Sequence, residues 1–255
     1  MSLSDIELFF SGVRIFVSKF AEVLNASLNW YERNADNIKQ YIFAFADFGV
    51  WCSAVEKMAN NQIIFTDDLS IEFANEIYDS LDIDAVIEKY YSENDDQRLN
   101  CVIERCKNSK KIEDYTLLFF QTIEAYKLGH YHLACVGLFS VIDGILADVT
   151  NMINATNFKR RIEAVNEKFD AKIELNDIDR RTLCIYDSVN IIKDSIFGGS
   201  DFSKAEPNGI NRHWVMHGRT RRIYTRCDFL KVLLLLDAII FLSSNDIEID
   251  KELPV

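Results

Sequence analysis

The sequence predicts an all-α protein, and three observations support this fold class. The chain has two prolines and nine glycines in 255 residues, so nearly all of it lacks the residues that break helices. Apolar side chains recur at helical spacing through most long segments. Apolar residues make up 49% of the chain, which is enough to bury a core and excludes disorder as the main state.

We expect an N-terminal helical region over residues 1–110. Ser4 and Glu7 form the pattern of a capping box, which predicts a long amphipathic helix to about Tyr31. A second helical pattern follows as far as Met58, and it is rich enough in aromatic residues to be buried on more than one face.

Residues 67–96 form an acidic flank of this region. From residue 67 to residue 98 there are eleven acidic side chains against two basic ones. Interleaved apolar residues keep the segment foldable as short helices, so it does not resemble a disordered acidic tail. Two interpretations stay open, a solvated outer face or a surface that masks a basic site elsewhere in the chain.

A second unit is expected over residues 111–245. Its first helical stripe covers residues 112–126 and ends at Gly129, and a nearly all-apolar helix follows over residues 131–149. Two adjacent helices joined by a tight turn form an antiparallel hairpin.

Further helices are expected over residues 157–169 and 177–197, the second with Asn176 as its N-cap. Residues 198–209 hold the densest collection of turn residues in the chain, which predicts a loop directly before the motif described below.

The last elements are a short helix over residues 211–217, ended by Gly218, and a final core helix. Thr225 and Asp228 form a second capping box that opens the final helix, which runs through Leu242. Residues 246–255 are expected to be a C-terminal tail.

The sequence predicts a cytoplasmic protein without a membrane anchor. The amino terminus enters an amphipathic pattern without the basic region and short apolar run of a signal peptide. The longest apolar stretch, Val232–Leu242, has eleven residues with Asp237 among them, whereas a membrane span needs about 20. The six cysteines include no CxxC pair, so neither a disulfide framework nor a zinc ribbon is expected.

A cluster of basic side chains follows residue 211, although the chain carries a net charge of −12. Between residues 212 and 231 only Asp228 opposes six basic residues, which are Arg212, Arg219, Arg221, Arg222, Arg226 and Lys231. The planar guanidinium of Arg suits phosphate, and Trp214 and Tyr224 lie among the arginines, as stacking on bases requires. We therefore expect RNA or a nucleotide as the partner, and the expected RNA- and phosphate-binding residues are Asn211, Arg219, Arg221, Arg222, Tyr224 and Arg226.

His213 and His217 are four residues apart and share one helical face. No third metal ligand lies nearby in the sequence, so we expect neither a metal nor another cofactor. A pair of structural histidines beside a buried Trp214 is the plain alternative. In the chemical interpretation, His transfers protons near its ordinary pKa of about 6.5 and Arg stabilises charge in the transition state. An acid, a base and a cation suffice for metal-free cleavage of RNA.

Arg212, followed directly by His213 and after four intervening residues by His217, resembles the motif of the HEPN superfamily of helical ribonucleases and nucleotide-binding modules. The preceding hairpin, with its turn at Gly129 and an apolar helix that carries Asp143, is similar to the first two helices of such domains. The resemblance covers about residues 112–243.

This resemblance implies a helical bundle that forms a homodimer, in which two motif helices face each other across one cleft. It also implies metal-independent endoribonuclease activity in phage-defence or toxin–antitoxin systems, with an antitoxin or a regulatory protein as a further partner.

Arg212, His217, His213 and Asp143 are the expected catalytic residues. Asp143 either orients an imidazole or pairs with Arg212; alternatively it only caps a local bend before Gly144. On an ideal helix, Arg212 and His217 are about 140° apart and roughly 7 Å apart along the axis, so one helix does not easily aim both at one phosphate. Two copies across a twofold axis do so more easily.

Two other functions stay open at this point. The first is a non-catalytic helical module that binds a nucleotide, RNA or a partner protein through the same basic patch. The second is an interaction protein whose arginines pair with an acidic surface, such as its own residues 67–96.

Overall fold

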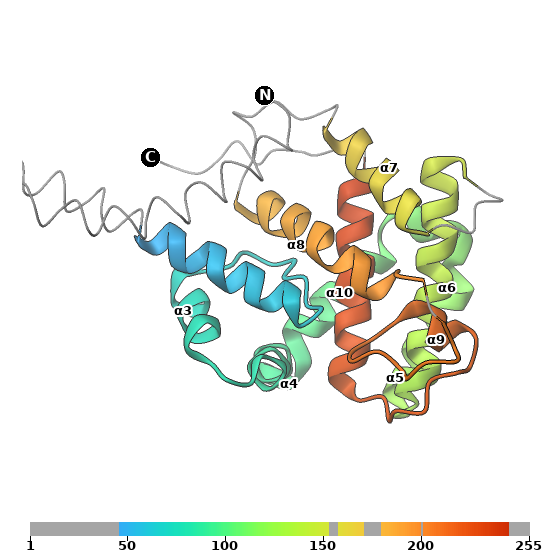
Figure 1. Cartoon of the computed structure of the whole chain (residues 1–255), viewed down its shortest axis with the longest axis horizontal. Coiled ribbons are helices and arrows are strands. Elements are labelled where there is room, and N and C mark those ends of the chain that lie inside the picture. The colour runs from blue at the N-terminus through green and yellow to red at the C-terminus, as the bar shows by residue number, and fades with distance from the viewer. Residues whose placement is uncertain (1–45, 153–157, 171–179, 200, 245–255) are drawn as a thin grey trace, which may run out of the picture.

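The computed structural model describes residues 46–152, 158–170, 180–199 and 201–244, and all regular elements in these ranges are helices (Figure 1). The described part begins in a helix over residues 46–60. The following elements are, in chain order, α3 (Ile71–Asp79), α4 (Ile83–Lys107), the 3-10 helix η1 (Lys110–Tyr115), α5 (Thr116–Lys127), α6 (Tyr131–Thr150), α7 (Phe158–Asp170), α8 (Arg180–Ile196), α9 (Arg212–Met216) and α10 (Arg226–Ser243). The all-α fold class is confirmed for these residues, whereas the helix expected between Ser4 and Tyr31 lies outside them.

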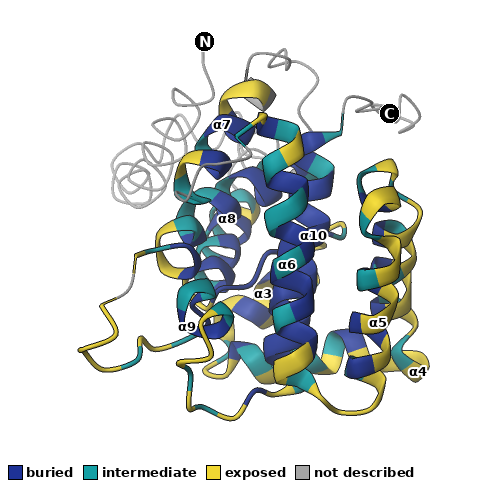
Figure 2. Cartoon of the chain, turned by 90° about the vertical axis from the view of Figure 1, so that its right-hand side faces the viewer, coloured by how far each residue is buried: buried dark blue, intermediate teal, exposed yellow. Residues whose placement is uncertain are grey.

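The helix α10 is the centre of the bundle. It begins with the expected capping box, in which the Thr225 hydroxyl accepts from the backbone N–H of Asp228 and the Asp228 carboxylate accepts from the backbone N–H of Thr225. Nearly every residue of α10 is buried (Figure 2). It packs against α4 and α6 most extensively, and also against α7 and α8. A helix that is apolar on all faces needs such neighbours on all sides.

The helices α5 and α6 form the expected antiparallel hairpin. Gly129 ends α5 with a φ of +77°, a left-handed conformation that suits glycine. The stripe over residues 112–126 was expected to be one helix, but the structure divides it into η1 and α5. The reason lies at Tyr115, whose φ of −110° and ψ of 7° depart from α-helical geometry.

By length and composition, one helix in the described residues, α6, is apolar enough to cross a membrane. Core helices of globular proteins meet the same criterion. In this structure α6 is packed against α5, α7, α9 and α10, and ten of its residues are buried. The expected cytoplasmic location stays a prediction.

The described part of the N-terminal region shares its core with the bundle. Ile87, Leu99 and Val102 of α4 belong to the same cluster of buried residues as Leu233 of α10. The boundary near residue 110 coincides with the start of η1, but the buried cluster continues across it.

The acidic flank folds as α3 and α4, and α4 is broken in its middle. Asn94, Asp95 and Asp96 have φ values of 53°, 56° and 61°, and Glu93 is extended. Left-handed conformations cost about 1–2 kcal/mol for most residues, although Asn and Asp adopt them more readily. Arg98 donates to the Glu93 carboxylate on one side of the break. Because this break divides α4 into two shorter helical parts, the expectation of short helices in this segment holds.

The remaining expected helices lie close to their predicted bounds. The helix α7 corresponds to the helix expected over residues 157–169, and α8 covers most of residues 177–197. Asn176, the expected N-cap of α8, lies outside the described residues.

Candidate functional site

The predicted motif lies on α9, whose start is fixed by Asn211. The side-chain oxygen of Asn211 accepts hydrogen bonds from the backbone N–H groups of His213 (3.0 Å) and Trp214 (3.3 Å). Its side-chain nitrogen donates to the carbonyl oxygens of Ser195 and Gly198, both at 3.3 Å. Asn211 is buried. In the structure, Asn211 is therefore a helix cap. It is not exposed to a phosphate, although the sequence suggested a phosphate-binding role for it.

The end of α9 presents His217 to solvent. His217 is the C-cap residue and is exposed, and Gly218 follows in the left-handed region with a φ of +60°. The backbone N–H of Arg219 then donates to the carbonyl of Trp214 at 2.9 Å. This turn stops the helix where the sequence predicted.

Gln62 holds the segment before α9 in place, a role that the sequence did not reveal. Its side-chain oxygen accepts from the backbone N–H of Ile210 at 2.6 Å, and its side-chain nitrogen donates to the carbonyl of Ile210 at 2.9 Å. The same nitrogen is 3.2 Å from the Ser195 hydroxyl. Because Gln62 follows the helix over residues 46–60, the N-terminal region contributes to the geometry of the motif helix.

Arg212 and Asp143 form an ion pair between α9 and α6. Both side chains are largely buried, with exposed fractions of 12% for Arg212 and 17% for Asp143. The guanidinium carbon of Arg212 lies 3.7 Å from the ring centroid of Phe158, so it also makes a cation–π contact. Of the alternatives for Asp143, the structure shows the one in which it pairs with Arg212.

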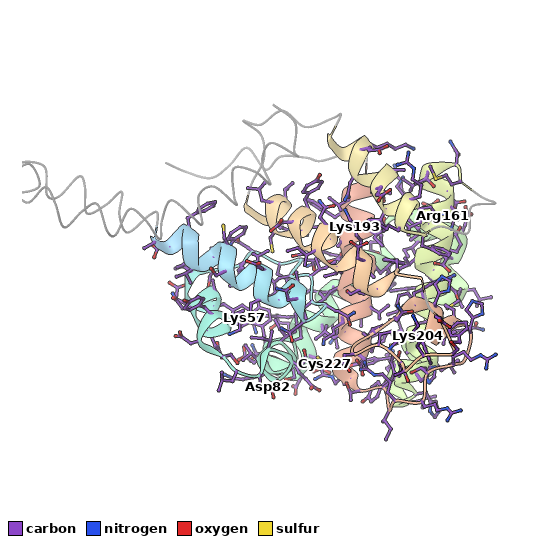
Figure 3. The ribbon with its side chains drawn as sticks, viewed as in Figure 1. Lys57, Asp82, Arg161, Lys193, Lys204 and Cys227 are labelled. Carbon is purple, nitrogen blue, oxygen red and sulfur yellow. The ribbon has the colours of Figure 1, made fainter. Side chains whose placement is uncertain are left out.

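Two polar atoms of this pair are buried without a hydrogen-bond partner among the described residues, namely Asp143 Oδ1 and Arg212 Nε. Arg161 of α7, labelled in Figure 3, donates from Nη1 to the backbone carbonyl of Asp143 at 3.4 Å. Burial raises the pKa of Asp143 above its ordinary value, and this effect exceeds the opposing effect of Arg212. The ionised pair is therefore held in surroundings that disfavour charge.

His213 and His217 lie next to each other, with ring centroids 5.6 Å apart. His213 is partly buried and His217 is exposed. Burial, together with the nearby Arg212 and His217, lowers the pKa of His213 below 6.5. At neutral pH, His213 is therefore a neutral imidazole that is able to accept a proton.

Phe202 is an aromatic side chain next to His217, a contact that the sequence did not reveal. Its ring centroid lies 5.5 Å from that of His217 and 5.3 Å from that of Trp214. It belongs to the loop between α8 and α9, where Figure 3 labels Lys204. Trp214 and Tyr224, the residues expected to stack on bases, are instead buried. The pattern of arginines with aromatic neighbours was visible in the sequence, but it did not show which rings reach the surface.

The basic cluster is partly neutralised within the chain. Arg222 forms an ion pair with Asp228, six positions later in the sequence. Arg226 lies 2.6 Å from an Asp96 carboxylate oxygen, 3.9 Å from one of Glu88, and donates to the Tyr126 hydroxyl at 3.0 Å. The side chain of Arg226, at the start of α10, therefore contacts both α4 and α5.

Lys231 adds another pair of the same kind, at 2.8 Å from the Asp84 carboxylate. Asp228 is the one acidic residue between positions 212 and 231, but three carboxylates of α4 also face the basic residues, which agrees with the interpretation that the acidic flank masks a basic site. Arg219 and Arg221 are exposed, and the described part of the chain offers neither an ion-pair partner. The Arg219 guanidinium lies 5.6 Å from the Phe202 ring centroid.

The structure thus brings the expected catalytic residues together as two pairs, Arg212 with Asp143 and His213 with His217. Arg212 turns inward to α6, whereas His217 faces the loop that carries Phe202. This divergence agrees with the angular argument from the ideal helix. Within the described residues, no group of three or more His, Cys, Asp or Glu side chains is arranged to hold a metal ion.

No family model matches the chain, and it matches neither a curated protein nor a solved structure. Fold and site together define the class of the protein only as a helical bundle with an Arg-x4-His motif on a short helix. The likeness to the HEPN superfamily rests on the residues named above.

Proposed function

We propose that the protein is a metal-independent endoribonuclease of the HEPN type, and that His213 and His217 transfer the protons of the reaction. The observation that supports this proposal most directly is the pair of adjacent imidazoles at the exposed end of α9, with centroids 5.6 Å apart. The lowered pKa of His213 suits a general base, and the exposed His217 suits a general acid. Arg219 and Arg221 supply positive charge on the same surface.

The proposed reaction is an attack of the ribose 2′-oxygen on the adjacent phosphorus. His213 accepts the proton of the 2′-hydroxyl, the new bond to phosphorus forms, and the bond from phosphorus to the 5′-oxygen breaks. His217 donates a proton to the departing 5′-oxygen. The products are a 2′,3′-cyclic phosphate and a 5′-hydroxyl, and neither a metal nor a redox partner takes part.

Arg212 and Asp143 have a supporting role in this proposal. Asp143 holds the Arg212 guanidinium against Phe158, from where its positive charge acts on His213 and on the phosphate region. A catalytic Arg212 that contacts phosphate directly needs to leave this ion pair. A homodimer supplies the second copy of α9 that the resemblance implies, and sedimentation at micromolar concentration measures whether it forms.

A non-catalytic module that binds RNA or a nucleotide is the alternative, and one observation favours it. The charge of Arg212 is largely buried and matched by Asp143, so the motif arginine is not directed to solvent. A binding surface needs only Arg219, Arg221 and the aromatic groups nearby. The pairing of Arg226 and Lys231 with α4 corresponds in part to the third function, an interaction of arginines with the protein's own acidic flank.

Incubation of the purified protein with total RNA in EDTA tests the proposal. Fragments that end in a cyclic phosphate, and that are absent with His217→Ala, would support it. RNA that is retained but stays intact supports the binding module instead. The same preparation tests the proposed cellular context, since an antitoxin or regulatory partner is expected to copurify from the cytoplasm and to suppress cleavage.

A further inference from the structure

A surface groove of about 520 Å³ borders the segment that follows the motif. It is lined by residues 129–133, at the turn between α5 and α6, and by residues 222–224, directly before α10. The two segments are about 90 residues apart in the sequence, so only the fold creates this groove. Its volume lies within the range of about 300–1,000 Å³ that is usual for ligand sites.

The groove combines flat ring systems with exposed apolar side chains. The His132 ring stacks on the Tyr224 ring with centroids 4.9 Å apart, and the Arg222 guanidinium also lies 4.9 Å from that ring. Leu133 and Ile223 stand at its edge, with exposed fractions of 61% and 89%. Nucleobases bind to such surfaces because their faces are apolar and polarisable.

The charge of the groove suits an anionic ligand. Its lining includes two imidazoles and a guanidinium but no carboxylate, in a chain of net charge −12. Arg222 is paired with Asp228, which is buried, so the opposing carboxylate does not face the groove. Arg221, which is exposed, directly precedes the lining segment. An acidic peptide would not use the flat rings, and an uncharged ligand would not use the positive charge.

The groove is also close to the proposed reaction site. Arg222 lies five positions after His217, and an extended chain of five residue steps spans at most about 17 Å. A strand of RNA with its scissile phosphate at His217 would therefore reach the groove within a few nucleotides.

We infer that this groove binds a nucleotide of single-stranded RNA that flanks the scissile phosphate. The inference rests on the proposed function for the identity of the ligand. The base lies against His132 and Ile223, and the backbone passes Arg219 and Arg221 on its way to His217.

Binding of a fully 2′-O-methylated 12-nucleotide RNA tests the groove separately from the chemistry, because this RNA has no 2′-hydroxyl to react. Ile223→Glu places a carboxylate at the mouth of the groove without disturbing the core. Leu81→Glu is the matched control, because Leu81 is fully exposed in the turn between α3 and α4 and the change in charge is the same. We expect Ile223→Glu to weaken binding roughly tenfold, about the value of one stacked base, and Leu81→Glu to leave binding within twofold. His132→Ala should weaken it to a similar degree.

Equal affinities of Ile223→Glu and Leu81→Glu, or no binding by the wild type, would overturn the groove assignment. Cleavage of unmodified RNA is measured in parallel. If the wild type binds the methylated RNA through the groove but cleaves nothing, the catalytic proposal fails and the groove stands. If it cleaves while the two variants bind alike, the groove fails and the catalytic proposal stands.

Discussion

The guanidinium of Arg212 and the carboxylate of Asp143 form a largely buried ion pair that joins the motif helix to the apolar helix α6. From the sequence, Arg212 is expected to face a ligand. In the structure it also holds two helices together, so the effects of its replacement on activity and on folding have to be separated.

We expect Arg212→Ala to lower the free energy of unfolding by about 3 kcal/mol, because it leaves the buried Asp143 carboxylate without its partner. The double variant Arg212→Leu with Asp143→Leu should lose less, since it removes both charges together. Urea denaturation measures both. If Arg212→Ala unfolds at the same urea concentration as the wild type, the ion pair does not contribute to stability.

His217→Ala should reduce cleavage by about 10² to 10⁴, the usual effect of removing a general acid or base. Its stability should match that of the wild type, because His217 is exposed at the end of α9. His217→Gln, which keeps hydrogen bonding but not proton transfer, should be equally inactive. Cleavage of a fluorescent RNA in EDTA measures both, and activity of either variant at the wild-type rate would remove His217 from the mechanism.

The lowered pKa of His213 predicts a pH dependence of stability. As the pH falls below 6.5, the unfolded chain takes up a proton at His213 before the folded protein does. The contribution of His213 to stability is therefore complete above pH 6.5 and is lost as the pH falls towards the lowered pKa. Denaturation curves of the wild type and of His213→Asn should diverge in this window. Parallel stability curves would mean that the pKa of His213 does not differ between the two states.

Arg221→Ala and Arg222→Ala remove the same charge from neighbouring positions and should behave differently. Arg221 is exposed, so its loss should weaken RNA binding and reduce the slope of log K against log salt by about 1, without a change in melting temperature. Arg222 pairs with the buried Asp228, so its loss should also lower the melting temperature. Titrations at several salt concentrations, together with thermal melts, separate the two. Identical behaviour would contradict the assignment of the Arg222 ion pair.

Gln62→Ala should loosen the segment before α9. It leaves the N–H and the carbonyl of the buried Ile210 without partners, which costs about 1–3 kcal/mol. Gln62 has a φ of +62°, so Gln62→Gly relieves backbone strain while it removes the same hydrogen bonds. We expect faster amide hydrogen exchange at residues 198–217 in both variants. Unchanged exchange in Gln62→Gly would show that the side chain does not hold this segment.

The sequence alone determined the elements whose signals are local. The capping box at Thr225 and Asp228, the turn at Gly129 and the stop at Gly218 were predictable, because each depends on residues a few positions apart. The apolar run of α6 predicted a buried helix for the same reason. The break in α4 was not predictable, since the ion pair of Asp96 with Arg226 at its end joins residues 130 positions apart.

The tertiary structure decided which members of the basic cluster remain available to a ligand. A count along the sequence treats the cations alike, but their partners come from other helices, Asp143 for Arg212, Asp96 for Arg226 and Asp84 for Lys231. Tyr224 is likewise buried, whereas Phe202 is partly exposed beside His217. The physical reason is that helical periodicity and caps act over a few residues, whereas the pairing and desolvation of a side chain depend on whatever the fold places against it.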